Sequence, residues 1–172
     1  RDRTYTFDDV VAALNKVQPH DWATFLNERI NQVAVKPPLD GLARGGYRLV
    51  YTESPTDYWK NNEARRKSVD LSYSIGLTLN RDGDVTGVQW EGPAFKQGMT
   101  AGTRLVAVNG MAYDADRLKE AITAGKSGAP ITLITKSGDF FRTVTIDYRG
   151  GLRYPRLERI SGRPARIDQI YT

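Results

Sequence analysis

The first part of the chain has apolar residues spaced three and four apart, which predicts two amphipathic helices. The first helix is expected after Thr6, which has the spacing of a capping box with Asp9, and Pro19 ends it. Asp21 is expected to cap the second helix. The two apolar faces consist of Phe7, Val10, Val11, Leu14 and Val17, and of Trp22, Phe25, Leu26 and Ile30. Because two short helices cannot bury such large side chains alone, they either pack on the domain that follows or end a larger domain.

The pattern changes to alternating apolar and polar positions further along the chain. A short helical turn is expected at Leu39–Ala43, and a half-buried strand at Tyr47–Thr52. Glu53–Asp70 is a long polar connection, which is predicted to be a solvent-exposed loop. The alternative is that this loop contacts a ligand. Two strands, Leu71–Asn80 and Val85–Trp90, are predicted to form a hairpin.

Turn signals punctuate the rest of the chain. Pro93 can start a short helix that Gly98 ends, and Asn109-Gly110 closes the apolar strand Leu105–Val108. An amphipathic helix with three inward apolar residues and a second hairpin follow, at Asp114–Ala124 (Leu118, Ala121, Ile122), Ile131–Thr135 and Phe140–Tyr148. The predicted fold class is mixed α+β, a small, partly open β-barrel with two helices, preceded by a short helical segment.

Composition adds limits to this picture. A chain of 172 residues with 40% hydrophobic content can bury a core, and no stretch approaches the roughly 18 consecutive apolar residues of a membrane span, so no membrane partner is expected. The sequence contains no cysteine, which excludes disulfides and thiolate metal sites and leaves cytoplasm and periplasm both open. Because the chain begins at Arg1 without an initiator methionine or a signal peptide, we expect a fragment of a longer protein.

The stretch Gly92–Gly110 resembles the centre of a PDZ domain, because three glycine-marked turns surround one short helix and one apolar strand. Ser74–Leu77 resembles the carboxylate-binding loop of such domains. By this resemblance, the backbone amides of Ile75, Gly76 and Leu77 bind the carboxylate of a peptide end, and the peptide adds as a strand. The groove for it would be lined by Thr78, Leu79, Ala115, Lys119 and Thr123. The alternative is that Ile75-Gly76-Leu77, one glycine between two apolar residues, forms a bulge or a close packing contact.

Nearly the whole chain resembles the carboxy-terminal third of bacterial glycyl aminopeptidase-type, thermolysin-like zinc metallopeptidases. The residues that carry this resemblance are Tyr5–Asn15, Pro38–Tyr47, the PDZ-like core and Leu152–Arg159. The resemblance implies that residues 1–45 end a truncated catalytic domain, that 46–150 form a PDZ-like domain, and that 151–172 form an Arg/Pro-rich tail. It also implies a parent enzyme that releases amino-terminal glycine or alanine from peptides.

The zinc site of that family cannot be assembled from this sequence. It requires two histidines one helical turn apart with a glutamate beside the first, whereas this chain has a single histidine, His20. His20 lies between Pro19 and Asp21 and is expected to be an exposed residue near a helix cap. We therefore expect no catalytic residue, no metal ligand and no activity in the fragment, with zinc confined to the parent enzyme.

Positive charge is concentrated at the carboxy-terminal end. The net charge is +5, and beyond residue 148 six arginines stand against two acidic residues. Such a segment can contact nucleic acid through its arginines. Prolines and glycines interrupt it, however, and it could equally contact an acidic face of the missing catalytic domain. Nucleic acid is therefore not the expected partner. Two functions stay open: a module that binds peptides or polypeptide ends for an attached aminopeptidase, and a structural domain that braces the catalytic domain without a peptide ligand of its own.

Overall fold

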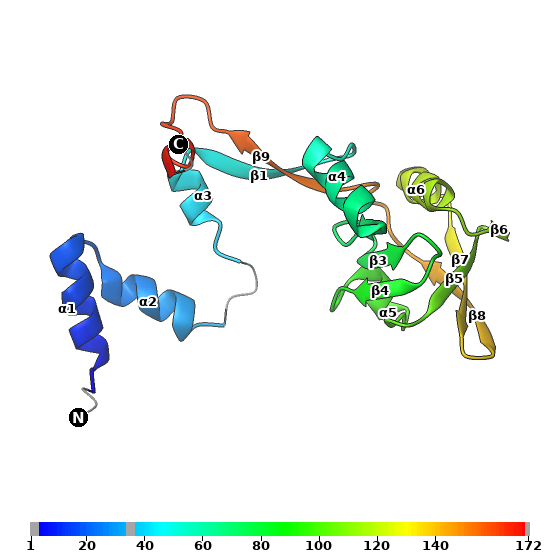
Figure 1. The fold of residues 1–172 in the computed structure, drawn as a ribbon, viewed down its shortest axis with the longest axis horizontal. Helices are drawn as coiled ribbons and strands as arrows, with labels where there is room; N and C mark the ends of the chain where they lie inside the picture. Colours follow the sequence, from blue (N-terminus) through cyan, green and yellow to red (C-terminus); the bar gives the residue numbers. More distant parts are fainter. Residues whose placement is uncertain (1–3, 34–36, 171–172) are drawn as a thin grey trace.

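The computed structural model describes residues 4–33 and 37–170, and Figure 1 shows its sheets together at one side with a pair of helices set apart. The predicted ranges 1–45 and 151–172 also contain residues 1–3, 34–36 and 171–172, which lie outside the described residues. The helices are α1 Phe7–Val17, α2 Trp22–Ile30, α3 Asp40–Arg44, α4 Asp57–Arg66, α5 Pro93–Lys96 and α6 Ala115–Ala124, with 3-10 turns at Gly125–Ser127 and Asp168–Ile170. The strands are β1 Tyr47–Thr52, β2 Ser68–Leu71, β3 Leu77–Asn80, β4 Val85–Val88, β5 Arg104–Val108, β6 Met111–Ala112, β7 Ile131–Ser137, β8 Phe140–Ile146 and β9 Tyr154–Arg159.

Helices α1 and α2 begin where the sequence predicts. The Thr6 side chain accepts a hydrogen bond from the Asp9 amide while the Asp9 carboxylate accepts from the Thr6 amide, which completes the capping box. Asp21 caps α2 through the amide of Thr24. Neither helix contains a buried residue among the described ones, and Val17 and Ile30 are 85% and 70% exposed. The apolar faces of this helix pair are therefore largely uncovered in the described part of the chain.

Strands β1 and β9 form a two-stranded antiparallel ribbon, with Tyr47 opposite Arg159 and Thr52 opposite Tyr154. Figure 1 shows the ribbon extending from the sheets toward α3. At the other end of the ribbon Tyr154 is buried, and its ring lies 5.9 Å from that of Trp59 in α4, in an edge-to-face arrangement. The arginine-rich end of the chain thus contains a strand that pairs with β1.

The hydrophobic core lies between a three-stranded sheet, in the order β2-β3-β4, and a four-stranded sheet, in the order β6-β5-β7-β8. The helix α6 contributes Leu118, Ala121 and Ile122 to this core, as predicted. The tight turn after β5 is also confirmed, because Asn109 and Gly110 have φ angles of 48° and 80°. The mixed α+β fold class is confirmed, with open sheets.

Two predicted elements differ from the structure. The polar connection Glu53–Asp70 contains α4 and β2, because Thr56 caps a helix through the amide of Trp59. The predicted single strand Leu71–Asn80 is divided between β2 and β3 by a turn. In that turn the Asp70 carboxylate accepts hydrogen bonds from the amide and the hydroxyl of Ser72, an arrangement that reverses the chain locally.

Candidate functional site

The loop that resembles a carboxylate-binding loop connects β2 to β3. Gly76 has a φ of +79°, a conformation that favours glycine. Its amide donates to the carbonyl oxygen of Leu71 at 3.0 Å, and the amide of Ser74 donates to the same oxygen at 3.0 Å. The carbonyl oxygen of Ile75 accepts from the amide of Ala94 at 3.0 Å, and the Ile75 side chain is fully buried. The Gly76 amide, predicted to bind a peptide carboxylate, therefore already has an acceptor from this chain.

Strand β3 is paired along both of its edges. On one side Leu77 lies opposite Leu71 and Leu79 opposite Val69, and on the other side Leu77 lies opposite Val88. A peptide that adds as a strand needs a free edge with unpaired N–H and C=O groups. The predicted addition along Thr78 and Leu79 meets no such edge in this structure, and Leu79 is fully buried in the core. The strand β2 occupies the position that the sequence assigned to a peptide.

The face of α6 that was predicted to line the groove contacts α4, which in turn bonds to β2. Lys119 forms an ion pair with Glu63 of α4 across 3.9 Å, and the other carboxylate oxygen of Glu63 accepts from the Asp70 amide of β2 at 2.6 Å. The side chain of Glu63 is only 13% exposed. Burial raises the pKa of Tyr154 to about 12, and the negative charge of Glu63 acts in the same direction. Glu63 thereby links α4, β2 and α6.

The remaining predicted groove residues are divided between two environments. Ala115 packs half-buried against the core, whereas Thr123 is exposed and its hydroxyl donates to the carbonyl oxygen of Lys119 at 2.9 Å. Lys119 and Thr123 line a surface hollow together with Leu152, and none of Ile75, Gly76 or Leu77 lines it. This hollow therefore joins predicted α6 residues to Leu152 and does not include the predicted loop.

Sequence reasoning missed the residues that close the groove. Leu71 was predicted to belong to a continuous strand, and Glu63 to a solvated segment. The cap at Thr56 and the turn formed by Asp70 and Ser72 are local signals that could have indicated a helix and a reversal here. The pairing of β2 with β3 has no comparable local signal.

The described residues offer no site for zinc. Residues 4–33 and 37–170 contain no cluster of three or more histidine, cysteine, aspartate or glutamate side chains able to hold a metal ion. His20 packs edge to face against Trp22 and Phe25, with ring centroids 5.0 and 5.8 Å away. Within the same residues, every helix is too short or too polar to cross a bilayer.

Comparison with known proteins gives a likeness in structure. No protein-family model and no curated protein matches the sequence. The structure is similar to that of an aminopeptidase N family protein from Idiomarina loihiensis, with a TM-score of 0.54 and 14% identity over 90% of this chain and 27% of that protein. The HtrA3 PDZ domain bound to a phage-derived ligand matches 68% of this chain and 95% of its own length at 18% identity, but its TM-score of 0.32 is too low to establish a common fold. The chain thus shares its fold with about a quarter of a solved aminopeptidase N family protein.

Proposed function

We propose that this chain is a non-catalytic, PDZ-like module of a larger peptidase, and that its peptide groove is closed by its own strand β2. The order of elements, the resemblance of Ser74–Leu77 to a carboxylate-binding loop and the fold likeness to an aminopeptidase N family protein support the first part. In this proposal a catalytic domain outside this sequence holds the zinc ion and removes amino-terminal glycine or alanine from peptides.

The hydrogen bond from Gly76 to Leu71 carries the second part of the proposal. The Leu71 carbonyl occupies the acceptor position that a peptide carboxylate would take, and Val69 and Leu71 bury their side chains in the core. A competing peptide must withdraw both side chains, at about 1.5–3 kcal/mol each, and also lose its own translational freedom. Because β2 is tethered to β3 by a short turn, it has a large advantage in effective concentration.

A closed groove favours the bracing role over peptide capture at Ile75, Gly76 and Leu77. The described residues leave the apolar faces of α1 and α2 uncovered, as expected for surfaces that contact the rest of a parent protein. The ribbon of β1 and β9 connects this region to the core. Both elements suit a module whose main partner is the catalytic domain.

Nuclear magnetic resonance tests this proposal. The Gly76 amide should exchange slowly with solvent in the unliganded protein, because it is hydrogen-bonded inside the loop. Addition of a pentapeptide of four alanines and a carboxy-terminal leucine should leave the amides of Gly76–Leu79 and Lys119 unshifted. Saturable shifts of these amides, together with faster exchange in β2, would show that peptides displace β2 and that the groove is open.

A further inference from the structure

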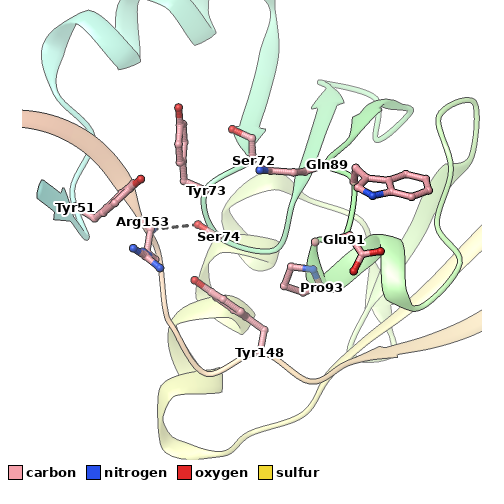
Figure 2. Close-up of a pocket in the computed structure, with 11 residues that line it drawn as sticks. Tyr51, Ser72, Tyr73, Ser74, Gln89, Glu91, Pro93, Tyr148 and Arg153 are labelled. Atoms are coloured by element: carbon pink, nitrogen blue, oxygen red, sulfur yellow. Dashed lines mark hydrogen bonds between the residues drawn. The ribbon is translucent and has the colours of Figure 1, made fainter. Parts of the chain in front are cut away.

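A second hollow lies on another side of the loop between β2 and β3, where β1, the segment before α5 and the residues leading into β9 meet (Figure 2). Its volume is about 320 Å³, within the lower range of small-ligand sites. The residues around it are Tyr51, Ser72, Tyr73, Ser74, Gln89, Trp90, Glu91, Gly92, Pro93, Tyr148 and Arg153. Of the predicted carboxylate-binding loop Ser74–Leu77, only Ser74 belongs to this set, and none of the amides or groove residues predicted to contact the peptide does.

Aromatic rings form much of the lining. The rings of Tyr51 and Tyr73 lie 5.6 Å apart, and Trp90 lies 4.5 Å from Phe95. Trp90 is 74% exposed, so its ring presents a large surface to a ligand as well as to Phe95. Rigid aromatic surfaces provide contact area for a peptide at a low cost in conformational entropy.

Arg153 supplies a fixed positive charge at one side of the hollow. Its guanidinium lies over the Tyr51 ring, 4.2 Å from the centroid, and its backbone amide donates to the buried Ser74 hydroxyl at 3.0 Å. Stacking leaves the N–H groups at the edge of a guanidinium free for a carboxylate. Within residues 4–33 and 37–170, Arg153 forms no ion pair with an acidic side chain.

The hydroxyl of Tyr148 is a donor without an acceptor. It is buried, and its proton meets no acceptor among the described residues. Burial raises the pKa of Tyr148, and the positive charge of Arg153 and a hydrogen bond from the Arg153 side chain oppose that rise. Figure 2 shows the hydroxyl directed toward the Arg153 guanidinium, with Glu91 on the far side of Pro93. A buried O–H group without an acceptor costs free energy, so an acceptor supplied by a ligand would be favourable here.

We propose that this hollow binds the carboxy-terminal carboxylate of a peptide, which forms an ion pair with Arg153 and accepts a hydrogen bond from Tyr148. The last side chain of the peptide then lies against the rings of Tyr51 and Tyr73. The site is separate from the closed groove at β3, so it gives the module a peptide ligand without displacement of β2.

The test uses acetyl-Ala-Ala-Phe with a free carboxylate and the same peptide as its carboxy-terminal amide. The free acid should shift the Trp90 indole and the tyrosine ring signals saturably, and the amide should bind at least about tenfold more weakly, as expected for loss of a charge-assisted hydrogen bond. Arg153→Gln should weaken the binding of the free-acid peptide by about tenfold or more. Arg156→Gln, the same change at an exposed arginine of β9 outside the hollow, should bind like the parent.

Tyr148→Phe provides a second variant, because it retains the ring and removes only the hydroxyl whose proton has no acceptor. It should bind the acid more weakly while its unfolding midpoint stays equal to or above that of the parent, a combination that a purely structural role would not give. Equal affinity for acid and amide, unchanged affinity in Arg153→Gln, or no saturable shift with the acid would overturn the proposal. Shifts confined to Gly76–Leu79 and Lys119 would instead contradict the closed groove as well.

Discussion

The amide of Gly76 donates to the carbonyl oxygen of Leu71 at 3.0 Å, so the loop that should receive a peptide end holds the end of β2. The same oxygen accepts from Ser74, and the Leu71 side chain is fully buried. Two donors on one carbonyl reproduce, within the chain, the arrangement that a nest of amides offers to an anion. The segment Ile75-Gly76-Leu77 therefore stabilises the packing of the hairpin formed by β2 and β3.

Gly76→Ala should lower the free energy of unfolding by about 1–2 kcal/mol, because a left-handed conformation is unfavourable for any residue with a β-carbon. The φ angle is +79°, and an added β-carbon would lie 3.5 Å from the β-carbon of Gln89, an ordinary contact. The cost thus comes from the backbone. Urea unfolding followed by tryptophan fluorescence measures it.

Gly41→Ala is the matched control for that substitution. Gly41 lies in α3 with nothing within 4 Å of its added β-carbon, so alanine there should be neutral or stabilising by roughly 0.5–1 kcal/mol. If Gly76→Ala proves as stable as Gly41→Ala, the loop can adopt another conformation and the bond to Leu71 does not fix it.

Glu63→Ala should destabilise the protein by about 1–3 kcal/mol, because the Asp70 amide would lose its acceptor in a partly buried position. Glu63→Gln retains an oxygen for that amide and loses only the ion pair with Lys119 at 3.9 Å, so it should stay within about 1 kcal/mol of the parent. Chemical denaturation of both variants distinguishes the two contributions. Equal losses would assign the stabilisation to the ion pair.

Tyr113→Phe should raise stability slightly, by up to about 1 kcal/mol, because the Tyr113 hydroxyl is buried and has no hydrogen-bond partner among the described residues. Burial raises the pKa of Tyr113 to about 12. The folded state therefore favours the protonated phenol, and this contribution is present below the unfolded pKa near 10 and lost as the pH rises toward 12. Thermal melts between pH 9 and about 11.5 should show a smaller alkaline loss for Tyr113→Phe than for the parent. An identical loss would place the titration on other tyrosines.

Asp84→Asn should remove part of the acid sensitivity of the fold. The Arg104 guanidinium donates to the Asp84 carboxylate at 2.6 and 3.0 Å, and together with Asn80 it lowers the Asp84 pKa to about 2. A lowered pKa gives stability above the unfolded value near 4, which is lost as the pH falls toward 2. Thermal melts from about pH 5 to pH 2 should thus fall less steeply for Asp84→Asn than for Asp139→Asn, a change at an exposed turn residue. Parallel curves for these two variants would contradict the assignment.

Local signals predicted the elements whose stability is itself local. Thr6, Asp21 and Asp114 all accept backbone hydrogen bonds at the starts of their helices, where apolar periodicity and a capping residue coincide. The turn at Asn109-Gly110 was equally readable, because its positive φ angles require such residues.

Apart from the local cap at Thr56 and the turn at Asp70 and Ser72, the elements that were missed depend on contacts between distant residues. The helix α4 is mostly polar, and its Trp59 packs on Tyr154 of β9, far away in the sequence. The pairing of Leu49 with Leu157 in the ribbon likewise depends on the whole chain being folded. The closed groove was unpredictable for the same reason: the alternation that favours a strand at Leu71–Asn80 is compatible with one straight strand or with two strands folded back on each other.

The ribbon of β1 and β9 has a consequence for how this unit can be moved between proteins. Tyr47 and Arg159 face each other, and the amide of Ile160 donates to the carbonyl oxygen of Gly46 at 2.8 Å. The two ends of the segment 46–160 therefore lie next to each other, held together by backbone hydrogen bonds between β1 and β9. A segment with adjoining ends can be inserted into a surface turn of an unrelated host protein without stretching either chain.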